Sequence, residues 1–390
     1  MGNSIFPLAA NVTLVASESL WLESEAVVQL NKTSELDGVI QAVGMPDLHP
    51  GRGYPIGASF LSQGRIYPAL VGGDIGCGMA LWHTDLKLRK LKKDKLEKKL
   101  RGADLDEGYQ YSDRYEQLEE LVNEYRKAYK LSQTAFDASL GTIGGGNHFA
   151  ELQQLDEIHD AEIVSQIGLN KDSVCLLVHT GSRGFGGDIL RKHVEAYSHD
   201  GVAVDTKAFD DYLHQHEQAL KYAKLNRLLV AQRFMTAMQC DGSELLDVHH
   251  NLVEQTKHGY VHRKGCTPAD QGLVMIPGSR GSHSYLVKPL DNLNAARALY
   301  SLAHGAGRKW QRSECKARLR DRYKRSELVR TKLGSHVICN DAALIYEEAP
   351  EAYKCIDSVI QSLVQANLVE IVARFAPIIS YKTNKGSSCS

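Results

Sequence analysis

The sequence predicts an α/β (α+β) fold, in which helices surround a mixed β-sheet within a single large domain over residues 1–390. Three observations support this prediction. The chain has 390 residues, 43% of them hydrophobic, which is enough to bury a large core. Short apolar runs typical of strands alternate with long helical stretches. The motifs that carry chemistry are spread from residue 47 to residue 382, and no repeat or Pro/Ser-rich linker divides them.

The composition places further limits on the class of protein. The 46 basic and 47 acidic residues leave a formal net charge of -1, so no global field attracts nucleic acid or membrane, and any anion site must be local. The N-terminus has no basic segment before its apolar stretch and nothing near the roughly 20 apolar residues of a membrane span, so we expect a cytoplasmic protein without membrane contact. Eight cysteines without CxxC pairs predict reduced thiols.

The first half of the chain predicts strands followed by helices. Residues 35–82 contain apolar runs broken by Gly and Pro, which indicates short strands joined by tight turns. Residues 85–101 carry nine Lys or Arg against three acids, and their leucines predict one buried helical stripe. The basic side of this helix is either a solvated face or a contact for a nucleic-acid backbone. Residues 113–135 predict a polar packing helix.

The second half of the chain combines one long helix with several apolar, strand-like runs. Residues 209–239 lack Gly and Pro and predict a long helix. Around it, apolar runs end in polar motifs that carry histidine or glycine, namely VCLLVHTGSRG, LLDVHHN, GLVMIPGSRGSHSYLV and ALYSLAHGAGR. We therefore expect the chemistry at strand ends and in the loops that follow them.

A metal site is the first candidate. Asp74 and Cys77 lie three residues apart among glycines in VGGDIGCGMA. Other loops offer His148 after Asn147, His179 at a strand end, and the adjacent pair His249 and His250. Each histidine alone is more often structural, but a thiolate, a carboxylate and several imidazoles together suit Zn, Mn or Co. A thiolate can also bridge two ions, with open positions left for substrate.

A nucleotide site is the second candidate. PGSRGSHSY, at 277–285, offers backbone N–H groups, hydroxyls and Arg280 to a phosphate or a base edge, although it matches no standard phosphate-binding loop. In HGAGR, His304 is followed by glycines and by Arg308, which suits a histidine that attacks phosphorus; a structural histidine opening a helix is the alternative. HRKG adds a basic turn with Arg263 and Lys264 as phosphate candidates, or merely a solvated loop.

Eight motifs, in order and at similar spacing, resemble the RNA-splicing ligase RtcB family: MPDLHPGRGYPIG, GGDIGCG, GGGNHFAE, HTGSRG, DVHHN, HRKG, PGSRGSHSY and HGAGR. The match runs from about residue 35 to the C-terminus. The resemblance implies the large mixed-sheet fold of this family. It also implies a ligase that uses GTP and two Mn²⁺ ions to join RNA 3′-phosphate or 2′,3′-cyclic phosphate ends to 5′-hydroxyl ends, through a histidine guanylate and an RNA-ppG intermediate.

The resemblance also assigns roles, residue by residue. It places one manganese on Asp74, Cys77 and His148 and the second on Cys77, His179 and His250, and it makes His304 the guanylated nucleophile. His249 has no assigned role, and Lys385 is a second candidate for the position matched by Lys382. The implied guanylate pocket consists of Asn147, His148, Phe149, Ala150, Glu151, His250, Asn251, Pro277, Gly278, Ser279, Arg280, Ser284, His304, Gly305, Ala306, Gly307 and Lys382.

The chain departs from the family pattern at a few positions. Arg280 stands where many members have Met, WQR at 310–312 replaces a more usual hydrophobic-Ser-Arg, and the chain continues past Lys382 as TNKGSSCS. Metal ligands and nucleophile are untouched, so the departures bear on substrate preference: tRNA halves in splicing, or broken RNA in repair. Some members of the family rely on a small activator protein, archease.

Two other functions are compatible with parts of the pattern. A binuclear metallophosphoesterase that hydrolyses RNA ends without sealing them would use the same Asp, Cys and His ligands. A catalytically weak subunit that binds RNA ends would need an incomplete metal site. HGAGR discriminates against the first alternative, because a hydrolase needs no histidine nucleophile, and the complete ligand set discriminates against the second.

Overall fold

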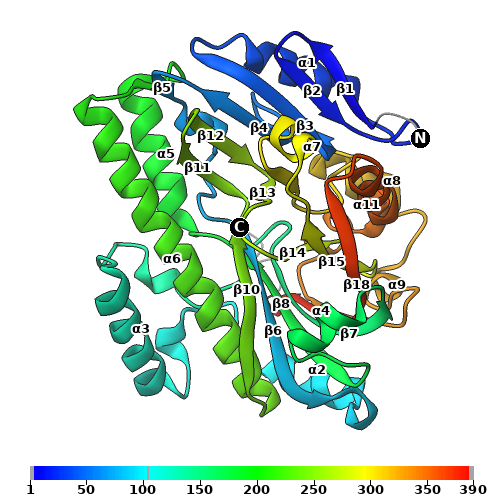
Figure 1. Cartoon of the computed structure of the whole chain (residues 1–390). Helices are drawn as coiled ribbons and strands as arrows, with labels where there is room; N and C mark the ends of the chain where they lie inside the picture. Colours follow the sequence, from blue (N-terminus) through cyan, green and yellow to red (C-terminus); the bar gives the residue numbers. More distant parts are fainter. Residues whose placement is uncertain (1–3, 103–104, 386–390) are drawn as a thin grey trace.

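The computed structural model describes residues 4–102 and 105–385, and within these residues two large β-sheets organise the chain (Figure 1). The six-stranded sheet has the order β1 (Ile5–Ala9), β2 (Val12–Val15), β3 (Val39–His49), β4 (Ile56–Ser62), β12 (Gly259–Lys264) and β11 (Asn251–Thr256). Most of its neighbouring strands are antiparallel, but β2 and β3 are parallel because α1 (Ser24–Ser34) connects them. The predicted mixed α/β class is confirmed.

The second large sheet contains eight strands within the described residues. Its order is β10 (Gly242–His249), β6 (Gly78–Lys87), β8 (Ser173–Thr180), β7 (Phe149–Ile158), β18 (Val369–Thr383), β15 (Ser284–Pro289) and β14 (Val274–Pro277), with β17 (His336–Cys339) paired to β18 in parallel. Every residue of β8 is buried, because β8 is a central strand with both faces covered. Two short pairs complete the strands: β5 (Arg65–Ile66) with β9 (Val202–Ala203), and β13 (Cys266–Pro268) with β16 (Ser301–Ala303).

The long helix α6 (Lys207–Met238) covers one face of the eight-stranded sheet (Figure 1). It begins at Thr206, whose side chain accepts the N–H of Phe209, and contains no Gly or Pro. Phe234 and Met235 pack with Leu176 and Val178 of β8 in one apolar cluster. The other α-helices are α2 (Lys93–Gly102), α3 (Tyr115–Tyr129), α4 (Ala161–Gln166), α5 (Gly184–Tyr197), α7 (Leu293–Arg297), α8 (Arg312–Leu319), α9 (Arg325–Leu328), α10 (Leu344–Glu347) and α11 (Ile356–Gln365). Short 3₁₀ turns occur at Pro68–Leu70, Leu88–Lys90, Tyr109–Tyr111, Asp137–Ser139 and Pro350–Ala352.

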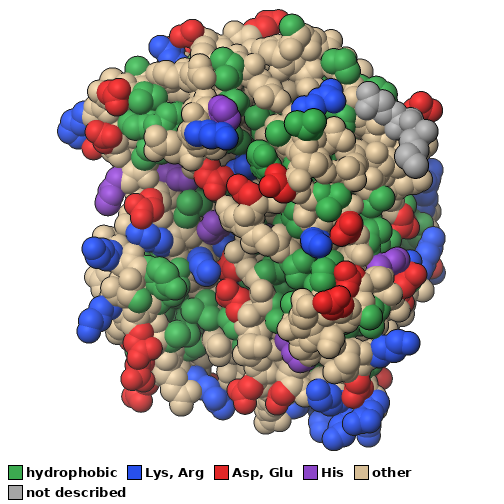
Figure 2. Space-filling model, in the orientation of Figure 1, with side chains coloured by type: hydrophobic (Ala, Val, Ile, Leu, Met, Phe, Trp, Pro, Cys, Tyr) green, Lys and Arg blue, Asp and Glu red, His purple; other side chains and the backbone are tan. Residues whose placement is uncertain are grey.

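The single helix predicted over residues 85–101 is wrong. Strand β6 continues to Lys87, a 3₁₀ turn follows, and α2 begins only at Lys93. The leucine spacing misled because strand, turn and helix all direct their leucines into the same cluster, where Leu96 and Leu100 are buried and the three earlier leucines are partly buried. Basic side chains gather at the lower edge of the face in Figure 2, where α2 and the end of β6 lie, and none of residues 85–101 lines the cavity described below.

Other boundaries shifted less. The helix expected over 113–135 is α3, and the helix expected over 209–239 is α6. Strands β3 and β6 are longer than the short strands expected, at 11 and 10 residues. HRKG is not a turn, because Lys264 is the last residue of β12. Among the described residues, no helix combines the length and the apolar character needed to cross a membrane.

Candidate functional site

The register of the eight-stranded sheet gathers the predicted ligands at one edge. Gly78 pairs with Thr180, Phe149 with His179, and Gly78 also with His249. These pairings bring together Cys77 before β6, His148 before β7, His179 near the end of β8, and His250. His250 lies between β10 and β11, where the chain passes from one large sheet into the other. The ligand set is therefore distant in sequence and adjacent in space.

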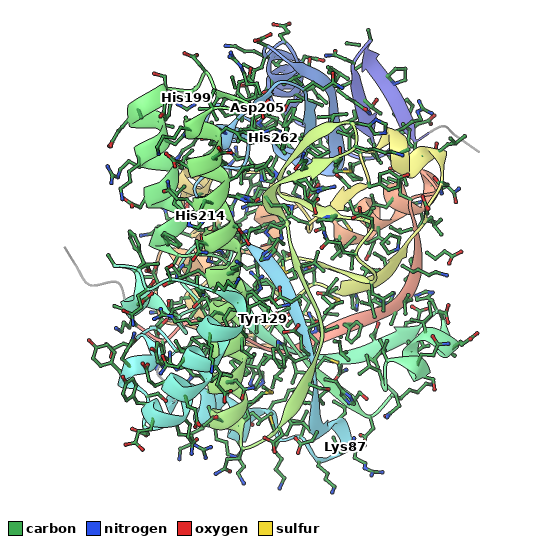
Figure 3. All side chains as sticks on the ribbon, turned by 60° about the vertical axis from the view of Figure 1, so that its left-hand side comes forward. Lys87, Tyr129, His199, Asp205, His214 and His262 are labelled. Carbon is green, nitrogen blue, oxygen red and sulfur yellow. The ribbon has the colours of Figure 1, made fainter. Side chains whose placement is uncertain are left out.

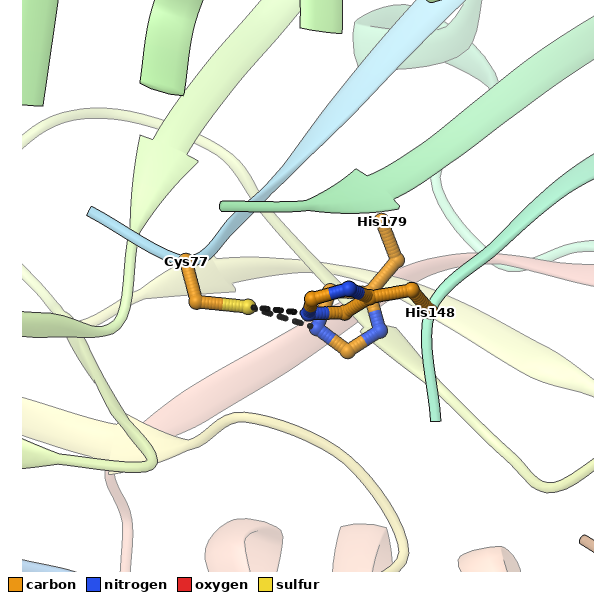
Figure 4. Close-up of side chains that lie close together, drawn as sticks. All are labelled: Cys77, His148 and His179. Atoms are coloured by element: carbon orange, nitrogen blue, oxygen red, sulfur yellow. Dashed lines mark hydrogen bonds between the residues drawn. The ribbon is translucent and has the colours of Figure 1, made fainter. Parts of the chain in front are cut away.

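Cys77 lies at the centre of this group (Figure 4). Its Sγ is 3.3 Å from His148 Nε2 and 3.2 Å from His179 Nε2. His148 Nε2 is also 2.9 Å from Asp74 Oδ2, and His179 Nε2 is 3.4 Å from His250 Nε2. The thiol thus contacts two imidazoles that in turn contact Asp74 on one side and His250 on the other, as a bridging ligand between two ions would.

The charge states of these groups follow from their burial. Burial raises the pKa of the Cys77 thiol well above its ordinary value, and Asp74 raises it further. Burial lowers the pKa of His179 and of His250 well below the ordinary value. Burial alone would raise the pKa of Asp74, but the adjacent His148 holds that pKa below its usual range. The imidazoles of His179 and His250 are therefore neutral at pH 7 and available as ligands, while the thiol must lose a proton to bind metal.

The donor set fits a transition-metal site. His179 Nδ1 lies 3.2 Å from the carbonyl oxygen of Asn147, which leaves Nε2 as the ligand nitrogen. The Nδ1 atoms of His148 and His250 are buried without a hydrogen-bond partner. One thiol, one carboxylate and three imidazoles within contact distance suit Mn²⁺ or Zn²⁺ better than Ca²⁺ or Mg²⁺, which prefer oxygen ligands.

Arg227 on α6 holds the backbone next to Cys77 and next to His179, through the residue before the first and the residue after the second. Its guanidinium is fully buried, forms an ion pair of 2.6 Å with Asp247, and donates to the carbonyl oxygens of Gly76 at 2.8 Å and Thr180 at 2.9 Å. Nδ1 of His249 lies 2.9 Å from the carbonyl oxygen of Gly76 and 3.1 Å from Nη2 of Arg227. His249, whose role the sequence left open, lies in this network behind the candidate ligands.

His304 shares the site. It follows β16, and its ring lies 4.8 Å from the ring of His250, measured between centroids. Its Nδ1 is 2.6 Å from Oδ2 of Asp47, and its backbone N–H donates to the same oxygen at 3.2 Å. Asp47 is fully buried on β3, so Nε2 is the remaining nitrogen of the ring and the one available for attack on phosphorus.

The sequence analysis missed Asp47, the partner of His304, and Lys354, which supports Asp47. It quoted Asp47 only as part of the motif MPDLHPGRGYPIG and gave it no role. Lys354 had no signal, yet it is buried and its Nζ donates to the carbonyl oxygens of Pro46 at 2.9 Å and Leu48 at 2.7 Å. Its backbone N–H also donates to Gly307 at 3.0 Å. Burial lowers the pKa of Lys354 to about 8, while the Asp47 carboxylate opposes that effect.

A cavity of about 860 Å³ joins these groups. Asp74, Cys77, His179, His250 and His304 line it. Of the implied guanylate pocket, the residues that line it are Asn147, Phe149, Glu151, His250, Asn251, Pro277, Gly278, Ser279, Arg280, His304, Gly305, Ala306, Gly307 and Lys382.

Three residues of the implied pocket do not line the cavity. His148 reaches the site through Asp74 and Cys77. Ala150 is fully buried in the apolar cluster beneath the sheet. Ser284 accepts a hydrogen bond from Gln153 at 2.8 Å and is buried in β15. These three positions shape the pocket from behind.

The far end of the cavity is strongly charged. Glu348, which the sequence analysis missed, is 3% exposed and lies 3.1 Å from Arg308 and 3.8 Å from Lys382. Burial alone would raise the pKa of Glu348, but Lys382 and Arg308 hold it below its usual range. Glu151 accepts from Gln153 at 2.8 Å and from Ser380, and burial raises its pKa.

Of the other basic residues predicted to bind phosphate or guanylate, Lys264 lines the cavity, whereas Arg263 and Lys385 do not. Arg263 is 2% exposed and pairs with Glu254, so it is neither solvated nor free for phosphate. Lys264 does line the cavity, with its Nζ 5.9 Å from the centre of the Tyr54 ring, and burial lowers its pKa to about 8. Lys385 pairs with Glu107 at 2.7 Å and does not line the cavity; residues 386–390 lie outside the described residues.

Backbone conformation accounts for two of the three glycines of GGGNH, and both of these glycines lie against arginines. An added Cβ at Gly144 would collide with the guanidinium of Arg183, and one at Gly146 would lie 2.7 Å from that of Arg312. Both glycines have positive φ, at +94° and +67°. The loop that carries Asn147 and His148 is therefore held against two cations.

Comparison with known proteins agrees with these observations. A family model described as tRNA-splicing ligase RtcB matches residues 29–107 and 100–383. A protein named RNA-splicing ligase RtcB2 from Escherichia coli is 50% identical over 390 residues, 99% of each chain. The tRNA-splicing ligase RtcB of Archaeoglobus fulgidus is 31% identical over 440 residues, 92% of this chain and 91% of its own. As the motifs predicted, this chain belongs to the RtcB family.

Proposed function

We propose that this chain is an RNA ligase that joins RNA 3′-phosphate or 2′,3′-cyclic phosphate ends to 5′-hydroxyl ends, in tRNA splicing or RNA repair, with GTP and two Mn²⁺ ions. The observation that carries the proposal is the pairing of His304 with buried Asp47 beside the Cys77 cluster in one cavity. Membership of a family described as tRNA-splicing ligases supports RNA ligation over the alternatives.

Five side chains would hold the metals. Asp74, Cys77 and His148 would bind one Mn²⁺, and Cys77, His179 and His250 the other. When bound, the ions stabilise negative charge on phosphoryl oxygens and activate the attacking oxygen. Asn147 orients His179 through its carbonyl oxygen, and Arg227 keeps the strand ends in place.

His304 acts as the nucleophile toward GTP, which is consumed as a substrate. Asp47 accepts a hydrogen bond from Nδ1–H, which holds the proton on Nδ1 and keeps the lone pair on Nε2. Nε2 forms a bond to the α-phosphorus, and pyrophosphate leaves with the electrons of the broken P–O bond. Lys264, in the cavity wall, offsets charge that develops on the phosphoryl oxygens.

The RNA ends then react in two displacements. An oxygen of the RNA 3′-phosphate attacks the guanylate phosphorus, the P–N bond to His304 breaks, and His304 returns to its neutral form paired with Asp47. The 5′-hydroxyl of the second RNA then attacks the activated 3′-phosphate and GMP leaves. A cyclic phosphate end is first opened by water to a 3′-phosphate.

A binuclear phosphoesterase is the second candidate, because the Asp, Cys and His ligands alone suit hydrolysis. It is less favoured, since hydrolysis needs neither a histidine nucleophile fixed through Nδ1 nor a cavity that extends to Glu151, Glu348 and Lys382. A weak RNA-binding subunit is not favoured either, because the ligand set is complete.

The test is covalent labelling. With Mn²⁺ and GTP labelled at the α-phosphate, the parent protein should acquire an acid-labile label, and His304→Ala should not. His214→Ala is a matched control, because His214 is exposed on α6, away from the cavity (Figure 3). Equal labelling of His304→Ala and parent would remove His304 as the nucleophile. Absence of label together with hydrolysis of a cyclic phosphate end would favour the phosphoesterase.

Location, partner and domain organisation complete the proposal. The described cysteines are all free, which supports a reducing compartment, and we propose the cytoplasm. Activation by an archease-type protein and a single domain over residues 1–390 stay predictions.

A further inference from the structure

Arg280 is an unusual charged residue because it is buried at the tip of a hairpin. It lies in the loop between β14 and β15, where arginine side chains normally reach solvent. Here the residue is only 8% exposed, and Nε, Nη1 and Nη2 are all buried without a hydrogen-bond partner. A buried guanidinium without partners is costly, so its persistence points to a ligand that supplies them.

The protein itself does not satisfy this guanidinium. Glu348 is one of the nearest anions, but one of its carboxylate oxygens contacts Arg308 and Arg312, and the other contacts Tyr353 and Lys382. Burial lowers the pKa of Arg280, and nearby Cys339 and Glu348 partly oppose that effect. A guanidinium stays charged in proteins, and this side chain, which lines the cavity, keeps its hydrogen-bonding capacity for an occupant.

The position of Arg280 favours the base of a nucleotide over its phosphates. The ionisable groups with the largest effect on its pKa are Cys339, Glu348, Glu351 and Tyr353, and none of them is a candidate metal ligand or His304. Lys382 lies in the same region, with its Nζ 3.8 Å from Glu348 and 5.9 Å from the centre of the Phe149 ring. If the α-phosphate lies at His304, this end of the cavity, with the aromatic rings of Phe149 and Tyr353 in its wall, receives the flat base.

We propose that Arg280 reads guanine by donating two hydrogen bonds to N7 and O6 of the base. Guanine presents two adjacent acceptors on this edge, which match the fork of a guanidinium, whereas adenine presents one acceptor and one donor. Arg280 is then a specificity-determining residue. This inference rests on the proposed function, since it requires a guanosine nucleotide in the cavity.

The test is equilibrium binding of GMP and 7-deaza-GMP to the full chain with Mn²⁺, measured by calorimetry. GMP cannot transfer a guanylate to His304, and 7-deaza-GMP lacks only the N7 acceptor. The parent should bind GMP about tenfold tighter than 7-deaza-GMP. Arg280→Met should lose that preference and bind GMP about tenfold more weakly, and Arg280→Lys should fall between. Arg320→Met, at an exposed arginine outside the cavity, should match the parent.

Either of two binding results would overturn the inference. One is that Arg280→Met weakens GMP and 7-deaza-GMP by the same factor, which would point to the phosphate or to the fold. The other is that the parent binds both nucleotides equally while it still labels His304 with GTP, in which case the proposed function stands and this inference alone fails. If the parent neither labels nor binds GMP, the proposed function fails first. Because Arg280→Met removes an unpartnered buried charge, its melting temperature should not fall below that of the parent, and a lower one would also contradict the inference.

Discussion

Asp47 accepts two hydrogen bonds from His304 through one carboxylate oxygen, from ring Nδ1 at 2.6 Å and from the backbone N–H at 3.2 Å. The two residues are 257 positions apart in the chain, and the contact forms where β3 passes the end of β16. It fixes both the rotation of the imidazole and the position of its proton. In the proposed reaction, this contact is what makes Nε2 a nucleophile.

Asp47→Asn should therefore abolish most guanylate transfer while leaving the fold intact. If the amide turns its N–H₂ toward Nδ1, that nitrogen must become the acceptor and the proton moves to Nε2, which can no longer attack. We expect the single-turnover rate of labelling by GTP to fall about a hundredfold or more. GMP binding should change little, and a rate close to that of the parent would contradict the orienting role.

Cys77→Ala and Asp74→Ala should differ in metal content. Cys77 contacts both His148 and His179, whereas Asp74 is hydrogen-bonded to His148 and to Cys77 itself. Metal analysis of protein loaded with Mn²⁺ should find both positions emptied in Cys77→Ala and mainly one in Asp74→Ala. Cys175→Ala, at a buried thiol on β8 outside the cavity, is the control. Equal losses in the two site variants would remove the bridging role of Cys77.

Metal affinity should rise with pH. Burial raises the pKa of Cys77 well above its ordinary value, so the thiol is protonated in the metal-free protein at pH 7, whereas His179 and His250 are already neutral. Binding must then release about one proton, and log Ka for Mn²⁺ should increase by about one per pH unit between pH 7 and 8.5. Calorimetry in buffers of different ionisation enthalpy counts that proton, and a pH-independent affinity would show that Cys77 is not a thiolate ligand.

Acid should destabilise the fold through buried histidines away from the ligands. Burial lowers the pKa of His49 and His216 to about 3 and that of His262 to about 4. Because the folded pKa values lie below the unfolded value near 6.5, the unfolded chain takes up protons first as pH falls. Their contribution is complete above pH 6.5 and is lost toward pH 3–4, by about 1.4 kcal/mol per histidine and pH unit.

Urea unfolding at pH 7 and pH 5 measures this loss. His216→Gln should reduce the dependence of stability on pH, because it removes one titrating group. The fold should persist, because the amide oxygen of Gln can still accept the N–H of Val253, which His216 Nε2 accepts at 3.1 Å. A stability that does not change between the two pH values would contradict the burial of these rings.

The sequence predicted the candidate site residues better than the residues that hold them in place. Cys77, His148, His179, His250 and His304 stand in short motifs at strand ends, so residue type and glycine context marked them as candidates, and the family resemblance assigned their roles. The metal and guanylate roles of these residues stay predictions, while their proximity is a structural finding.

Other features had no local pattern to reveal them. Arg227, Glu348 and Lys354 act through contacts between segments far apart in the chain, and nothing in their neighbouring residues marks them. The helix expected at 85–101 failed for a related reason, since tertiary packing in one apolar cluster imposed the leucine spacing on three different local conformations.

The most direct test of the account is end joining. The full-length protein is incubated with Mn²⁺, GTP, an oligonucleotide ending in 3′-phosphate and one beginning with 5′-hydroxyl, and the products are resolved by length. We predict a joined product that requires GTP, is lost in His304→Ala and is retained in His214→Ala. Removal of the 3′-phosphate without any joined product, or joining by His304→Ala at the parent rate, would contradict the account.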